Sequence, residues 1–167
     1  MKPMILKHAM YFGLLFGLMF SLNFYFSTIE AVIPNVLSWV LVLLMPYVAY
    51  RLAVDCRERV CDGVISYGTA LWYGIQLFFY AALVAAVFKL IYFNYISPDF
   101  LSLQIDQSLK LMEQMQLPLG AAEVAEVKKV LTPINMSLNY IWLDVLAGLM
   151  VSLFTAALVK RDAPMSN

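Results

Sequence analysis

The chain has 167 residues, of which 63% are hydrophobic and only 13% are charged. Soluble domains average about 45–50% apolar and about 25% charged residues, so a soluble core of this length could not bury so much apolar surface. The formal net charge is zero, which gives no basic field to attract nucleic acid. Composition therefore indicates that the lipid bilayer is the solvent and argues against a nucleic-acid partner.

Four apolar stretches are long enough to cross a bilayer, which takes roughly 20 residues. They predict transmembrane helices at about 9–28, 33–53, 68–93 and 138–159 within a single integral membrane domain, 1–167. A basic leader precedes the first stretch. However, its apolar run exceeds the roughly 7–15 residues of a signal peptide, and no small-residue cleavage site follows it. We therefore expect the first helix to be retained.

The connections between these spans differ in character. Residues 54–66 are predicted to form a short, charge-balanced loop. Residues 97–133 are the sizeable soluble piece, in which apolar residues recur at helical spacing on both sides of a "LPLG" break. The fold class is therefore an all-α membrane protein, with four transmembrane helices and an extracytoplasmic amphipathic helical hairpin between helices 3 and 4.

The basic residues predict the orientation, because cytoplasmic loops carry an excess of lysine and arginine. Placing both termini in the cytoplasm puts most of the basic residues there, notably at the ends of the helices. Those on the cytoplasmic side are then Lys2, Lys7, Arg51, Arg57, Arg59, Lys160 and Arg161. We expect a multi-pass protein of the bacterial inner membrane.

One carboxylate, Asp144, lies inside the apolar run of the fourth span. Intramembrane acids nearly always face the interior of a bundle, and small residues follow Asp144 at steps of four. Lys89 is embedded in the third span at its outer boundary, about one helical turn above Asp144, and a lysine side chain is long enough to bridge that gap, so we expect the two to pair between helices. The pair could hold the bundle together, or it could be a proton or cation site.

Small residues also mark the faces on which helices pack closely. Gly13, Gly17 and Ser21 follow one another at four-residue steps in the first span. In the fourth span the same spacing recurs at Gly148, Ser152 and Ala156. The first face supports packing within the chain at least as well as a homodimer.

Residue patterns typical of enzymes are not found. No Ser/His/Asp set, Gly-rich phosphate loop or paired carboxylates in one helix are recognisable. Cys56 and Cys61 stand among acidic residues, but His8 is distant in sequence and the spacing is looser than in a zinc knuckle. We therefore expect no catalytic residues, no metal and no cofactor.

The segments "CDGVISYGTALWYG" (61–74) and "FNYISPDF" (93–100) resemble the domain-of-unknown-function 4199 family of bacterial membrane proteins. The resemblance covers essentially the whole chain. It implies a four-helix inner-membrane protein of unknown activity, with no catalytic residues to carry over. It also points toward the assembly of the cell envelope or of lipid-linked glycans.

Two functions from different classes remain open. The first is a non-enzymatic accessory or scaffold subunit, which would bind a partner membrane protein in the bilayer. The alternative is a small oligomeric transporter or channel that uses the Asp144/Lys89 pair. The second function needs a polar path across the membrane, and the inner half of the fourth span offers little polarity beyond Ser152 and Thr155.

Overall fold

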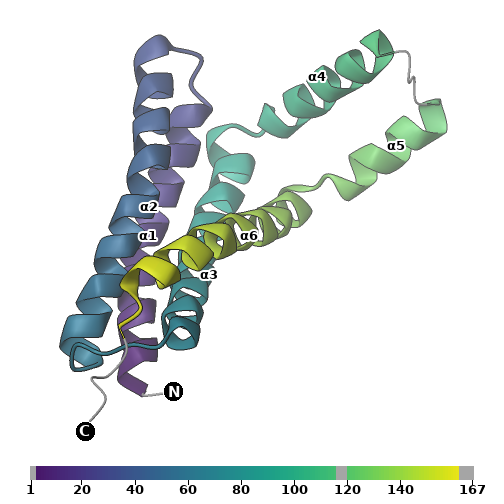
Figure 1. The fold of residues 1–167 in the computed structure, drawn as a ribbon. Coiled ribbons are helices and arrows are strands. Elements are labelled where there is room, and N and C mark those ends of the chain that lie inside the picture. The colour runs from purple at the N-terminus through teal and green to yellow at the C-terminus, as the bar shows by residue number, and fades with distance from the viewer. Residues whose placement is uncertain (1–2, 116–119, 162–167) are drawn as a thin grey trace, which may run out of the picture. The chain divides into compact units, whose positions relative to one another are not determined.

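The computed structural model describes residues 3–115 and 120–161 of the chain (Figure 1). The described residues form six α-helices and one π-helical turn, with an isolated β-bridge and no strand among them. In chain order these elements are α1 (Pro3–Ser27), α2 (Val32–Val60), α3 (Tyr67–Ile91), η1 (Tyr92–Ile96), α4 (Phe100–Gln114), α5 (Ala121–Val130) and α6 (Pro133–Val159).

Four of the helical segments are long and apolar enough to cross a membrane. They are Pro3–Ser27, Val32–Val60, Tyr67–Ile96 and Pro133–Val159. The prediction of an all-α membrane protein with four spans is therefore confirmed. Every span begins earlier or ends later than the apolar run alone indicates, because polar residues at a helix end can continue the backbone hydrogen bonding beyond the hydrocarbon.

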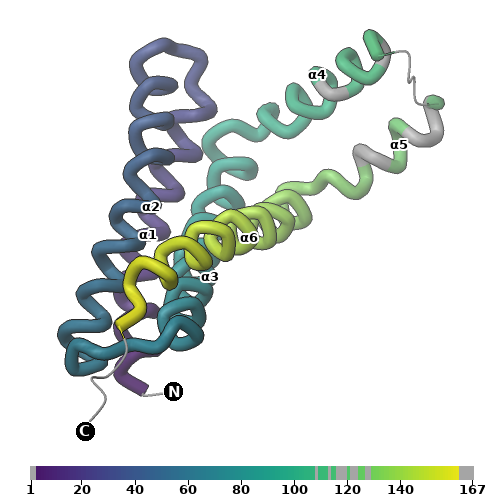
Figure 2. Tube along the Cα trace, viewed as in Figure 1, coloured from purple at the N-terminus to yellow at the C-terminus, as the bar shows by residue number. Residues whose placement is uncertain are grey.

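The chain divides into two compact units, Met1–Ala85 with Ile141–Asn167, and Ala86–Tyr140. The first unit contains α1, α2, most of α3 and most of α6. The second unit contains the end of α3, η1, α4, α5 and the start of α6. Within the first unit, α1 and α2 pack side by side, as can be followed in Figures 1 and 2.

The predicted loop at 54–66 is partly wrong, because α2 continues to Val60. Its charged residues stabilise the extra turns: Arg59 Nε lies 2.6 Å from Asp55 Oδ1, an i,i+4 pair on one helical face. The helix ends where the N–H of Cys61 donates to the Cys56 carbonyl at 3.1 Å. Asp62 and Gly63 then adopt positive φ values of 56° and 80°, which reverses the chain toward α3.

The soluble piece contains the two helices α4 and α5. Leu101 and Ile105, one turn apart on α4, are buried, whereas Leu103 and Leu111 are exposed. Residues 116–119, between the helices, lie outside the described residues, so the hairpin and its side of the membrane stay predictions.

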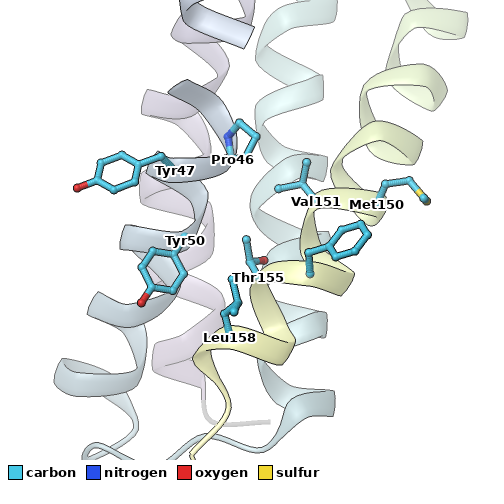
Figure 3. A pocket seen from close by; sticks show the side chains of 8 residues that line it. Pro46, Tyr47, Tyr50, Met150, Val151, Thr155 and Leu158 are labelled. Carbon is cyan, nitrogen blue, oxygen red and sulfur yellow. The ribbon is translucent and has the colours of Figure 1, made fainter. Parts of the chain in front are cut away.

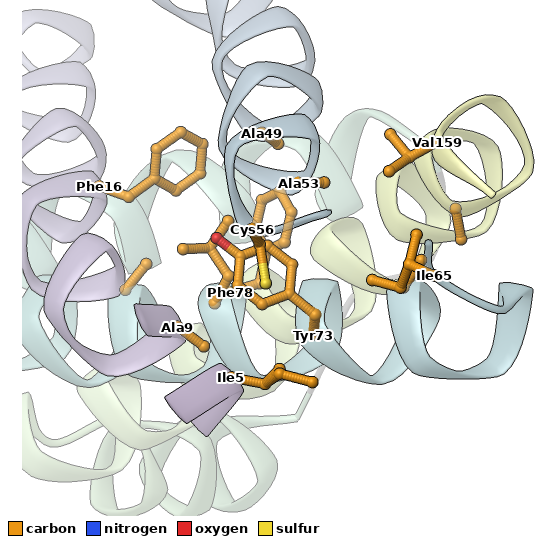
Figure 4. Packing of buried hydrophobic residues seen from close by; sticks show 14 of the residues in the cluster. Ile5, Ala9, Phe16, Ala49, Ala53, Cys56, Ile65, Tyr73, Phe78 and Val159 are labelled. Atoms are coloured by element: carbon orange, nitrogen blue, oxygen red, sulfur yellow. The ribbon is translucent and has the colours of Figure 1, made fainter. Parts of the chain in front are cut away.

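The core of the first unit is built from small residues and aromatic rings (Figure 4). On α2 the buried residues Met45, Ala49, Ala53 and Cys56 lie on one face at helical spacing. At one end of this unit, the backbones of Ile65 and Arg161 exchange hydrogen bonds of 3.1 and 2.9 Å. Arg57 Nη1 also donates to the Val159 carbonyl at 3.0 Å, so both ends of the α2–α3 turn region are tied to the end of α6.

Candidate functional site

An open groove of about 550 Å³ lies between α2 and α6 in the first unit. Figure 3 shows the side chains that line it, which come from both helices. Its volume falls within the range of roughly 300–1,000 Å³ that is usual for ligand pockets. Pro46, Tyr47, Tyr50, Met150, Val151, Phe154, Thr155 and Leu158 line it.

The lining of the groove is almost entirely hydrocarbon, with three hydroxyl groups. Thr155 Oγ1 donates to the Ser152 carbonyl at 3.3 Å, so its proton is used within α6. No hydrogen bond to the hydroxyl of Tyr47 or Tyr50 is found among the described residues. The groove therefore offers an apolar surface to a large occupant, together with two phenol hydroxyls that have no hydrogen-bond partner within residues 3–115 and 120–161.

A second feature is a polar cluster that joins α1, α2 and α3 in the same unit. Nε2 of His8 lies 3.1 Å from Oδ2 of Asp55, and Nδ1 of His8 lies 3.0 Å from the hydroxyl of Tyr73. Tyr73 also lies 3.3 Å from the Leu52 carbonyl and is fully buried within the core cluster shown in Figure 4. Arg59 binds the other oxygen of the Asp55 carboxylate.

The small residues of α1 lie directly against α3. A Cβ at Gly13 would be 2.7 Å from the Tyr80 Cβ, and a Cβ at Gly17 would be 2.6 Å from the Val84 Cβ. Ser21 is buried and its hydroxyl donates to the Gly17 carbonyl at 2.9 Å. These residues therefore serve packing within the chain.

The small residues of α6 also face α3. Gly148 lies against the ring of Phe78, and Ser152, fully buried, lies against Gly74 of α3. Ala156 belongs to the core cluster. The Ser152 hydroxyl donates to the Gly148 carbonyl at 2.6 Å, so it needs no partner from another helix.

Lys89 and Asp144 belong to the two different units, so their pairing stays a prediction. Lys89 is only 3% exposed, and its ammonium group lies 4.2 Å from the centroid of the Tyr140 ring in the second unit. This distance is that of a cation–π interaction. Asp144 is half-buried on α6.

A family model described as "Protein of unknown function (DUF4199)" matches residues 8–161. The chain belongs to this DUF4199 family. No curated protein and no solved structure matches the chain. The family description assigns no activity, so the function must be inferred from the groove and from the polar cluster.

In this DUF4199 chain, neither cysteine forms a disulfide bond, and Cys56 is buried whereas Cys61 is half-buried. Within residues 3–115 and 120–161, no group of three or more histidine, cysteine, aspartate and glutamate side chains is arranged to hold a metal ion. His8 is nevertheless brought within hydrogen-bonding distance of Asp55, although 47 residues separate them. The sequence interpretation missed this contact and the participation of Tyr73. The available signal was that all three residues are predicted near the same membrane surface.

Proposed function

We propose that the protein is a non-enzymatic accessory or scaffold subunit of the bacterial inner membrane, and that its α2–α6 groove receives a transmembrane helix of a partner protein. The apolar groove between two spans carries the proposal. Helices associate in membranes by close van der Waals packing and by interhelical hydrogen bonds, and a groove between two helices accepts the side-chain ridge of a third.

The burial of the four spans supports the choice of α2 as the docking helix. In the most apolar window of each span, 17% of the α2 residues are buried inside the protein, against 44% for the third span. Trp39, Leu43 and Tyr47 on α2 are mostly exposed. A helix that offers this much of its surface to its surroundings has room for another helix alongside it.

The two phenol groups favour a protein over a lipid tail as the occupant. A tyrosine hydroxyl away from water usually has a hydrogen-bond partner, and a hydrocarbon chain cannot provide one. Tyr47 and Tyr50 have no such partner among the described residues. A partner helix can provide one through a polar side chain or an exposed carbonyl group.

The buried hydroxyl groups favour this function over transport. Ser21, Ser137 and Ser152 donate to the carbonyl four residues earlier in their own helix, and Thr155 donates three residues back. Hydroxyls that are bonded in this way are less free to line a path for ions or polar solutes. Their role is better explained by close helix packing.

The proposal also specifies the orientation of the chain in the membrane and the pathway to which the partner belongs. Both termini lie in the cytoplasm, because this orientation places the basic residues near the termini and those at the end of α2, which together are most of the basic residues, on the cytoplasmic side. The family resemblance favours a partner in the assembly of the envelope or of lipid-linked glycans.

Site-specific photocrosslinking in living cells tests the proposal. A photoreactive phenylalanine replaces Tyr47 or Phe154, which line the groove from its two sides, or Trp39, an exposed α2 residue outside it. Each probe is combined with Met150→Trp, which fills the groove. The matched control is Leu146→Trp, because Leu146 is as exposed as Met150 but lies one turn away and does not line the groove.

We expect one membrane protein other than a second copy of the chain to be crosslinked from both groove positions. The adduct should be lost with Met150→Trp and kept with Leu146→Trp. Adducts with lipid alone, adducts with a second copy, or an equal adduct from Trp39 would each contradict the proposal. The identified partner then assigns the pathway.

A further inference from the structure

The cluster of His8, Asp55 and Tyr73 has a hydrogen-bond pattern that depends on the charge of the histidine. A tyrosine hydroxyl has one proton to donate, and an ionised carboxylate only accepts. Tyr73 Oη lies 3.3 Å from the Leu52 carbonyl, which also only accepts, and 3.0 Å from Nδ1 of His8. Asp55 lies 3.1 Å from Nε2 of His8.

These contacts are all satisfied together by one arrangement of protons. Tyr73 donates its proton to the Leu52 carbonyl and accepts a hydrogen bond from Nδ1–H of His8. Nε2–H of the same ring donates to Asp55, which Arg59 holds at its second oxygen at 2.6 Å. Both ring nitrogens then carry protons, so the histidine in this arrangement is the imidazolium cation.

We propose that His8, Asp55 and Tyr73 form a proton-binding site that joins α1, α2 and α3. When the proton leaves, the Nδ1–H bond breaks, its electron pair remains on Nδ1 and the proton passes to water. The Tyr73 hydroxyl then turns from the Leu52 carbonyl and donates to Nδ1, while Nε2–H remains on Asp55. Proton release therefore breaks the hydrogen bond between α3 and α2, and it reverses the direction of the hydrogen bond between α3 and α1.

The surroundings of the histidine make this exchange feasible. The His8 side chain is 11% exposed and the Asp55 side chain 28% exposed, so water can reach both. Tyr73 is fully buried, so its hydroxyl donates either to the Leu52 carbonyl or to Nδ1 of His8, and not to water. Asp55 and Arg59 from α2 and Tyr73 from α3 are the ionisable groups that the described contacts place around the ring, besides Lys7, its neighbour in α1. The thiol of Cys56 on α2 is also close to Tyr73 (Figure 4) and to Asp55.

Histidine is the side chain that ordinarily changes charge between about pH 5 and 8, which covers the pH of the bacterial cytoplasm and of an acidified cell. This proton-binding site is separate from the proposed docking groove: it lies between α1, α2 and α3, and its ligand is a proton, not a partner helix. It would let the packing of three spans respond to the proton concentration on one side of the membrane.

The chain has a single histidine, which makes a direct measurement unambiguous. Protein purified with a tag that contains no histidine is labelled with ¹⁵N at the imidazole ring and reconstituted in lipid nanodiscs. Nitrogen NMR spectra are recorded between pH 5 and 9. We expect two protonated nitrogens at low pH, and at high pH a neutral ring with its proton on Nε2.

Two substitutions test the contributions of Tyr73 and Asp55 separately. Tyr73→Phe removes the donor to Nδ1 of the neutral ring, so the Nδ1 signal at high pH should shift to that of a nitrogen without a hydrogen bond, while Asp55 keeps the proton on Nε2. Tyr11→Phe, at an exposed position on α1, is the control. Asp55→Asn removes the carboxylate, so the midpoint of the titration should move to lower pH; Asp62→Asn in the following turn is its control. Circular dichroism and gel filtration establish that each variant is folded.

The wild-type spectrum alone can overturn the proposal. A ring that keeps one protonation state from pH 5 to 9 does not bind and release a proton. A neutral ring with its proton on Nδ1 contradicts the exchange at Tyr73. An unchanged titration midpoint in the folded Asp55→Asn variant would show that the carboxylate is not part of the site.

Discussion

Gly17 of α1 lies so close to Val84 of α3 that a Cβ at position 17 would be 2.6 Å from the Val84 Cβ. The same Cβ would be 2.8 Å from the Ala81 carbonyl oxygen, which belongs to the α3 backbone and cannot turn aside. Glycine is therefore required here by the approach of two helices. Gly13, one turn earlier, meets Tyr80 and the Leu77 carbonyl in the same way.

Gly17→Ala should destabilise the fold because the added methyl group forces α1 away from α3. Overpacking of this kind costs about 1–3 kcal/mol. The measurement is thermal unfolding in detergent, followed by the loss of the monodisperse peak in gel filtration. Gly68→Ala is the matched control, because a Cβ at Gly68 of α3 has no neighbour within 4 Å. Equal melting temperatures for the two variants would contradict the close approach.

Arg57→Ala should weaken the end of the bundle at which α2 meets α6. Arg57 Nη1 donates to the Val159 carbonyl, one of the last carbonyls of α6, which lack partners in their own helix. Loss of a hydrogen bond from a charged donor costs about 1.5–3 kcal/mol. Hydrogen exchange of the last turn of α6 reports the change locally. Arg51→Ala, on an exposed face of α2, should leave that exchange unchanged; similar acceleration in both variants would indicate a nonspecific effect of lost charge.

The number and type of the spans could be predicted from sequence because long apolar runs have few alternatives to a membrane helix. The end of α2 could not be placed in this way. The segment "DCRERVCD" is charged and follows the apolar run, which is typical of a loop. The i,i+4 interaction of Arg59 with Asp55 favours the helical conformation there, and hydropathy does not report such a pair.

The polar cluster was harder to predict for a different reason. His8, Asp55 and Tyr73 come from three helices, and which faces of these helices meet depends on their rotation. The glycines at positions 13 and 17 set that rotation for α1, since only one face can approach α3 so closely. Each residue could be assigned to a membrane surface from sequence, but its neighbours could not.

The predicted Lys89–Asp144 pair can be tested by exchanging the charges. Asp144→Lys and Lys89→Asp should each lower the yield of folded protein, because removing one partner of a buried pair costs about 3–5 kcal/mol. The double variant should recover most of the yield if the two side chains meet. Lys110→Asp, at an exposed position of α4, controls for the addition of a negative charge. A double variant as poorly folded as the single ones would contradict the pairing.

Tyr140 provides an independent prediction for the same lysine. The Lys89 ammonium group lies over the Tyr140 ring at 4.2 Å, and a desolvated cation–π contact contributes about 2 kcal/mol. Tyr140→Leu should therefore lower the melting temperature more than Tyr140→Phe, which keeps an aromatic face. Equal destabilisation by the two substitutions would assign the role of Tyr140 to its hydroxyl.

The natural cysteines can report the orientation of the chain. Cys61 ends α2 and is half-buried, whereas Cys56 one turn earlier is fully buried, so a maleimide should react with Cys61 in folded protein and not with Cys56. With both termini in the cytoplasm, Cys61 faces the cytoplasm too. A membrane-impermeant maleimide should then leave intact spheroplasts unlabelled and label inverted membrane vesicles. Cys61→Ser should abolish the label and Cys56→Ser should keep it. Labelling of Cys61 in intact spheroplasts would show that the orientation is the opposite of the predicted one. The proton-binding site would then lie on the outer side of the membrane.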